Sequence, residues 1–107
     1  MLPRSRVVSA FNTVPSEVLF GVFDARRRKP RPALVYCGDD RKGKQVAAKL
    51  IRDVGFDPMD VGPLSMARLT EPFAILMGAL AYDVPGGPDI AYRFQHYADR
   101  ASGGQRR

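Results

Sequence analysis

Short apolar stretches alternate along the chain with longer segments whose apolar residues recur every three or four positions. The short stretches contain β-branched or aromatic residues and are bounded by Pro, Gly or Asn, which is typical of strands. The predicted strands are residues 6–11, 33–37 and 56–61. The longer segments have the spacing of amphipathic helices, with a shorter helical turn at 15–20. The predicted helices are residues 39–54, 65–82 and 88–98. This alternation predicts an α/β fold with a three-stranded sheet.

The segment at 39–54 has the clearest helix pattern. Its apolar positions are Val46, Ala47, Leu50, Ile51 and Val54. Gly55 follows as a stop signal, and Asp39 and Asp40 precede the helix at the positive end of its dipole. We interpret these two acids as structural and not as metal ligands. In the third strand Pro58 has no amide hydrogen to donate, so this strand is expected to lie at an edge of the sheet or to start with a bulge.

The stretch 57–71 combines a strand end, a Gly-Pro turn and a helix start. An open α/β sheet binds its ligand at such strand ends. Gly62 and Pro63 turn the backbone, and Ser65 is expected to cap the helix that follows. Arg68 lies one turn in and would suit a carboxylate or phosphate, although an ion pair with Glu71 is the alternative role.

This stretch, Gly62-Pro63-Leu64-Ser65-x-x-Arg68-Leu69-x-Glu71, resembles the C-terminal signature of the NADP oxidoreductases that depend on the deazaflavin coenzyme F-420. Three further segments match that family in the same order, and the oxidoreductase domain of the six-transmembrane metalloreductases is similar in the same stretches. These segments are 7–15, 37–40 and 55–62. The matches extend from Arg6 to about Phe94. The resemblance implies a fold like the C-terminal half of a Rossmann-type NADP-binding domain.

Members of that family begin with a half that carries G-x-G-x-x-G, where glycines let the backbone approach a pyrophosphate. None of the ten glycines here forms that motif. The chain is therefore expected to be a truncated oxidoreductase with a weak or incomplete NADP site, inactive alone. The resemblance implies hydride transfer between NADPH and F-420 or a flavin-type acceptor, once a partner or oligomer completes the site.

The resemblance also implies which residues bind the cofactors. Asn12 and Thr13 correspond to a segment beside the nicotinamide, and Ser65 and Arg68 line the acceptor side. Judged from the residues alone, Asn12 and Thr13 are also common turn residues at a strand end. No catalytic residue is assigned. The expected partner is a second copy of the chain, or a separate Rossmann half, because helices 65–82 and 88–98 add apolar residues that a three-stranded layer cannot bury.

Composition changes this interpretation only slightly. The chain has 107 residues and a formal charge of +6, of which Arg26, Arg27, Arg28, Lys29 and Arg31 supply five. A solvated loop at 24–32 explains this run better than nucleic-acid binding, since no aromatic residue is interleaved to stack on bases. No uninterrupted apolar run approaches the roughly 20 residues of a membrane span. No signal peptide is recognised before Arg4 either, so a cytoplasmic protein is expected. The single cysteine, Cys37, cannot form an internal disulfide.

Three function classes remain at this level. The first is the NADP-dependent oxidoreductase, the second a non-catalytic binding or assembly module derived from that family, and the third a nucleic-acid contact through residues 26–31. Residues 1–99 are expected to form a single domain, and residues 100–107 a disordered basic tail. The only histidine, His96, is expected on the surface.

Overall fold

The computed structural model describes residues 7–97, and within them three strands form one mixed sheet in the order β1-β2-β3. β2 (Ala33–Gly38) is central, β3 (Asp57–Asp60) pairs with it in parallel, and β1 (Val8–Ser9) pairs antiparallel. The predicted three-stranded α/β fold is therefore confirmed, and β3 with its Pro58 is an edge strand as expected. β1 is shorter than the predicted 6–11, whose first residue lies outside the described range. The expected tail at 100–107 also lies outside it.

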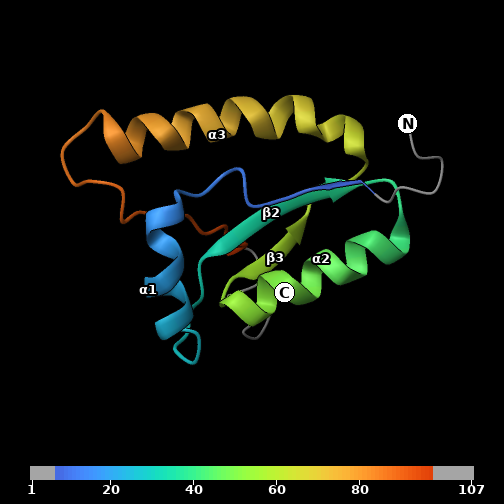
Figure 1. Ribbon diagram of the computed structural model, residues 1–107, viewed down its shortest axis with the longest axis horizontal. Coiled ribbons are helices and arrows are strands. Elements are labelled where there is room, and N and C mark those ends of the chain that lie inside the picture. Colours follow the sequence, from blue (N-terminus) through green and yellow to red (C-terminus); the bar gives the residue numbers. More distant parts are fainter. Residues whose placement is uncertain (1–6, 98–107) are drawn as a thin grey trace.

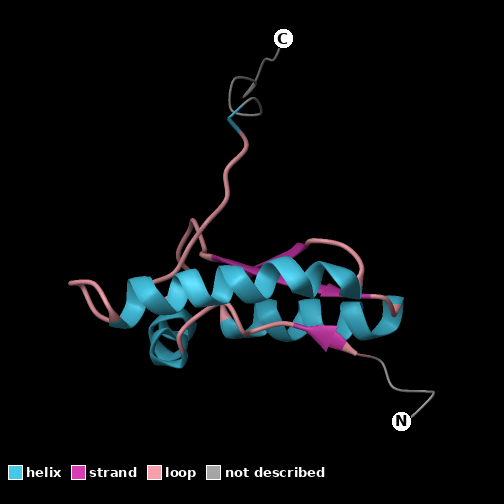
Figure 2. Ribbon diagram, turned by 90° about the horizontal axis from the view of Figure 1, so that it is seen from above, coloured by secondary structure: helices cyan, strands magenta, loops and turns pink. Residues whose placement is uncertain are grey.

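Helices cover both faces of this sheet (Figure 1). The helical elements are η1 (Ser16–Val18), α1 (Leu19–Asp24), α2 (Arg41–Val54), η2 (Leu64–Met66) and α3 (Ala67–Tyr82). α2 connects the two parallel strands and packs on one face, while α3 lies along the other. Both long helices run lengthwise along the molecule (Figure 2).

The ends of α2 follow from its sequence. The Asp40 carboxylate accepts a hydrogen bond from the Gly43 amide at 2.6 Å, so it caps the first turn. Gly55 ends the helix with a φ of 125°, and a Cβ there would lie 2.6 Å from the Val22 carbonyl oxygen. Only glycine permits this close approach of α2 to α1.

The core lies between β2 and α2. All six residues of β2 are buried, as a strand covered on both faces requires. Leu34 and Tyr36 point toward α2, where they pack with Ile51, while Val35 faces α3. The other buried members of this cluster are Val18, Val22, Ala48 and Phe56.

The helix predicted at 88–98 is wrong over the described residues. From Pro88 to His96 the chain is not helical, and Tyr92 instead bridges to Ala33 at the start of β2. The Ala33 amide donates to the Tyr92 carbonyl oxygen at 2.7 Å. β1 is too short to cover this part of β2, and a buried backbone amide without a partner is costly. Tertiary pairing therefore overrides the helical spacing of the apolar residues.

Tyr92 joins three parts of the molecule. Its hydroxyl accepts from the Val35 amide at 3.0 Å and lies 2.6 Å from the Thr13 hydroxyl. Its ring meets Phe73 of α3 edge-on, with centroids 5.0 Å apart. One side chain thus ties the loop after β1 and the helix α3 to the central strand.

One helical segment of the described residues, Leu64–Tyr82, is long and apolar enough to cross a membrane by length and composition. Its mean hydropathy is 1.2, and 17% of the window is buried. The sequence predicted no such segment, because Arg68 and Glu71 interrupt its apolar residues. Length and composition are weak evidence for a span, since helices of soluble proteins can pass the same test.

We expect Tyr92→Phe to destabilise the fold by about 1–3 kcal/mol, because the buried Val35 amide loses its partner. Chemical denaturation of both proteins, followed by circular dichroism, measures this difference. Tyr82→Phe is the matched control, since its hydroxyl contacts Glu17 at the exposed surface and both groups stay hydrated. An equal or larger loss in Tyr82→Phe would contradict the role given to Tyr92.

Tyr92 is also expected to make the stability of the fold depend on pH in the alkaline range. Burial raises the pKa of Tyr92 and outweighs the hydrogen bonds with Thr13 and Val35, which lower it. Folding therefore favours the protonated phenol. This contribution to stability is complete below the unfolded pKa of about 10 and is lost as pH rises toward the folded value. The fall in unfolding free energy above that pH should be shallower in Tyr92→Phe than in the parent.

Candidate functional site

A small pocket lies between the loop after β1 and the C-terminal half of α3. Its volume is about 240 Å³. The loop contributes Asn12, Thr13, Val14, Pro15 and Ser16, and α3 contributes Ala74, Met77, Gly78 and Tyr82. The structure therefore brings two of the four predicted site residues, Asn12 and Thr13, into one cavity.

The backbone before this pocket is strained. Phe11 has a φ of 64°, in the left-handed region that costs a side-chain-bearing residue roughly 1–2 kcal/mol. The turn leaves the Asn12 side chain exposed and Thr13 fully buried. Within the described chain the Asn12 amide has no hydrogen-bond partner, so both its donor and its acceptor are available to a ligand. Strain of this kind concentrates at functional sites.

Thr13 acts differently from Asn12. Its hydroxyl is 0% exposed and shares a hydrogen bond with the Tyr92 hydroxyl. The Thr13 side chain therefore holds the loop in place. Thr13 lines the pocket, but its hydroxyl is already hydrogen-bonded to Tyr92. Nothing in the sequence indicated the pairing between Thr13 and Tyr92, because the apolar spacing around Tyr92 predicted a helix.

Two features of α3 shape the rest of the pocket. At one end the Tyr82 hydroxyl donates to Glu17 at 2.5 Å, and this bond lowers the pKa of Glu17 and raises the pKa of Tyr82. In the wall, a Cβ added at Gly78 would meet nothing within 4 Å. A glycine at this position leaves the pocket open without being required by the backbone.

Ser65 and Arg68 do not line this pocket. The prediction that Ser65 caps the helix is wrong, since neither η2 nor α3 has a side-chain cap. The chain enters α3 through the η2 turn, where the Met66 amide donates to the Pro63 carbonyl at 2.9 Å. Arg68 is exposed and forms no ion pair with Glu71, so that alternative role is absent. Arg68 lies roughly 15 Å from Gly78 along the helix axis.

The turn between β3 and α3 is nevertheless firmly built. Asp39 accepts from the Leu64 amide at 2.9 Å, and the Gly38 amide donates to the Gly62 carbonyl at 3.1 Å. Gly62 has a φ of 114° and donates its own amide to Asp60. Asp39, like Asp40, therefore has a structural contact, as predicted from the sequence. Among the residues from 7 to 97, no group of three potential metal ligands occurs.

Cys37 and the basic segment also have structural roles. Cys37 is a fully buried core residue, and burial raises the pKa of its thiol. The Arg26 guanidinium lies 3.9 Å from the ring centroid of Phe23, and Arg31 donates to the Arg26 carbonyl at 2.7 Å. Arg27, Arg28 and Lys29 of the same run are exposed. His96 is exposed, as predicted.

Comparison with solved structures finds the same fold in a protein of Arthrobacter sp. FB24 assigned as an F-420-dependent NADP reductase. The two agree with a TM-score of 0.72 over 88% of this chain and 42% of the reductase, at 22% sequence identity. The chain has the fold of this part of the reductase. The resemblance that the sequence predicted is therefore confirmed at the level of the fold.

Comparison with curated proteins also finds a reductase. The chain is 32% identical to the metalloreductase STEAP3 of Rattus norvegicus over 71 residues, which is 66% of this chain and 14% of the relative. No family model matches the sequence. The chain thus spans well under half of either protein, although both similarities are to reductases.

We expect the Thr13–Tyr92 contact to be energetically coupled. Thr13→Val keeps the side-chain volume but removes the hydroxyl, so it should lower the unfolding free energy by about 1 kcal/mol. A double-mutant cycle with Tyr92→Phe should then give less than the sum of the two single losses. Asn12→Ala serves as the control and should leave stability nearly unchanged. Full additivity of the two substitutions would contradict the coupling.

Proposed function

We propose that this chain forms the acceptor-binding part of an NADP-dependent oxidoreductase. In this proposal hydride passes between NADPH and coenzyme F-420 or a flavin-type acceptor, after a partner supplies the dinucleotide-binding half. The observation that carries the proposal is the unpartnered Asn12 amide at the rim of a pocket, in a fold shared with a reductase. The cofactors would supply the hydride chemistry, and this chain would bind and orient the acceptor.

The acceptor in this proposal lies along α3. Its ring would enter the pocket beside Asn12, where the amide can both donate and accept. Its anionic part would extend toward Arg68, whose guanidinium has no acid partner in the described structure. Ser65 lies in the turn just before and would contribute a hydroxyl. An elongated acceptor would span the distance between the pocket beside Asn12 and the start of α3, where Ser65 and Arg68 lie.

The NADP site is proposed to be weak in this chain alone. No glycine-rich turn opens α2 or α3, so the described chain has no cradle for a pyrophosphate at a helix start. The dinucleotide would be held mainly by the completing half. Cytoplasmic location remains a prediction, and the rival function is a non-catalytic assembly module.

We also propose that the chain forms a homodimer through α3. Ile75 is 75% exposed, and Leu69 and Leu76 are each 54% exposed, which leaves an apolar surface on this helix. Covering several hundred Å² at roughly 25 cal/mol per Å² would stabilise association by several kcal/mol before its entropic cost. A two-fold arrangement of α3 against its copy would cover this surface in both subunits.

We expect the chain to bind oxidised F-420 or FMN more tightly than NADPH, whose dissociation constant should be on the order of 1 mM or poorer. Gly78→Leu fills the pocket and Arg68→Ala removes the anion contact, so each should weaken acceptor binding by about tenfold. Calorimetric titration measures all three ligands.

Arg27→Ala is the matched control, because it removes an exposed arginine far from the pocket. Arg27→Ala should bind the acceptor with the same affinity as the parent. Acceptor binding that is absent, or that survives both Gly78→Leu and Arg68→Ala, would favour the assembly module. Low-micromolar NADPH binding by the chain alone would contradict the incomplete dinucleotide site.

We expect Ile75→Asp to convert the dimer into a monomer, since the substitution would bury a carboxylate in the apolar interface. Light scattering at micromolar concentrations measures the mass. Phe20→Asp is the control, because Phe20 is 83% exposed on α1 and lies outside the proposed interface. A well-folded monomer in the unsubstituted protein would contradict the proposal.

A further inference from the structure

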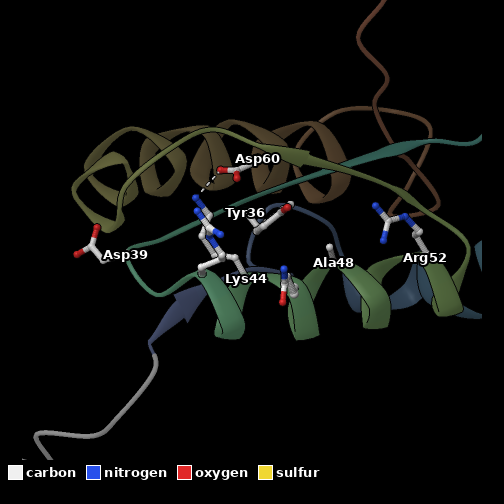
Figure 3. Close-up of a pocket in the computed structure, with 8 residues that line it drawn as sticks. Tyr36, Asp39, Lys44, Ala48, Arg52 and Asp60 are labelled. Atoms are coloured by element: carbon white, nitrogen blue, oxygen red, sulfur yellow. Dashed lines mark ion pairs between the residues drawn. The ribbon is translucent and has the colours of Figure 1, made fainter.

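A second and larger hollow lies beside α2, on the opposite side of the sheet from α3. Its volume is about 490 Å³, within the range of sites that hold small ligands. The hollow shares no residue with the pocket beside Asn12. α2 contributes Arg41, Lys44, Gln45, Ala48 and Arg52, and the strand ends and the turn after β2 contribute Tyr36, Asp39 and Asp60 (Figure 3).

The helix arranges its contribution along one face. Arg41, Lys44, Ala48 and Arg52 are separated by three or four residues each, so they form a stripe that faces β3. Ala48 lies in the middle, and its small side chain leaves space above the helix. Arg41 and Arg52 stand at the two ends, roughly 16 Å apart along the helix axis.

The carboxylates of the hollow already have partners. Asp60 forms an ion pair with Lys44 at 2.8 Å and accepts from the Gly62 amide at 2.9 Å. Burial opposes its ionisation, but these two hydrogen bonds and the Lys44 charge outweigh it and lower the pKa of Asp60. Asp39 accepts from the Leu64 amide. Lys44 and Asp60 therefore compensate each other.

Apart from Lys44, which donates to Asp60 and to the Gly62 carbonyl oxygen, the side-chain donors of the hollow have no partners among the described residues. Among the described residues, neither the Arg41 nor the Arg52 guanidinium forms a hydrogen bond or an ion pair, and the Gln45 amide is also unpaired. Tyr36 is only 8% exposed, yet its hydroxyl has no hydrogen-bond partner. The hydroxyl points into the hollow on the side of Ala48 and Arg52 (Figure 3). The hydroxyl is therefore available to donate to an acceptor atom of a ligand in the hollow.

We propose that this hollow binds an elongated organic phosphate, with anionic groups at two positions, of the size of a sugar bisphosphate or a nucleotide. Arg41 and Arg52 would each hold one anionic group through paired N–H donors, and Tyr36 and Gln45 would donate to oxygens between them. A nucleic-acid strand fits less well, because no exposed aromatic side chain lines the hollow for base stacking. The site is independent of the acceptor pocket proposed above.

Titration of the full chain with fructose 1,6-bisphosphate tests this site. We expect saturable binding that perturbs the amide resonances of α2, and inorganic phosphate should bind about tenfold more weakly because it reaches one guanidinium only. Arg41→Ala and Arg52→Ala should each weaken bisphosphate binding by about tenfold or more. Tyr36→Phe removes only the hydroxyl and leaves the net charge unchanged, and it should weaken bisphosphate binding by about fivefold.

Lys42→Ala is the matched control, since it removes one exposed charge from the same helix turn but does not line the hollow. Its affinity should change by less than about twofold. Absence of bisphosphate binding, or equal losses in Lys42→Ala and Arg52→Ala, would overturn the proposal. Tighter binding of short single-stranded DNA that displaces the bisphosphate would also overturn it and would assign the groove to nucleic acid. Gly78→Leu should leave bisphosphate binding unchanged, which separates this site from the acceptor pocket.

Discussion

The backbone amides on one edge of β2 require partners that β1 is too short to provide. β1 pairs only with Cys37 and Gly38, which leaves Ala33 and Val35 on the same edge. Tyr92 meets both requirements, because its carbonyl oxygen accepts from Ala33 and its hydroxyl accepts from Val35. A segment far away in the sequence thus takes the place of the missing part of a strand. The positions of the loop after β1 and of α3 depend on this contact.

The sheet separates two hollows of different chemistry. On the α3 side the pocket is small and combines a single available amide with apolar walls. On the α2 side the hollow is larger and is rich in donors without partners, since its carboxylates are occupied by Lys44 and by backbone amides. This difference arises because alternate residues of β2 face opposite sides, with Tyr36 toward α2 and Val35 toward α3.

α3 carries two kinds of surface. Met77 and Ala81 are buried on its inner face and Phe73 packs on Tyr92, while Ile75 remains exposed. A three-stranded sheet cannot cover a helix of this length and apolar content on all sides. Within the described residues, part of the apolar surface of α3 therefore has no cover.

The sequence by itself determined the elements whose causes are local. The apolar periodicity of 39–54, the acids before it and Gly55 after it were sufficient for α2, and the continuous apolar run at 33–37 was sufficient for the buried central strand. The ordered motif matches also identified the reductase fold. The helix and strand patterns depend on residues within a few positions of one another, and each matching motif is itself a short segment.

Only the tertiary structure decided where distant residues meet. The apolar spacing of 88–98 indicated a helix, yet pairing of Tyr92 with Ala33 satisfies a buried amide that no local pattern reveals. The same limit applies to the sites: Thr13 is held by Tyr92 and Arg68 lies apart from Asn12. Tyr36, an ordinary strand residue in the sequence, lines a hollow with Arg52. Hydrogen bonds across the sheet and the stacking of helices on its two faces set these distances, and sequence spacing does not encode them.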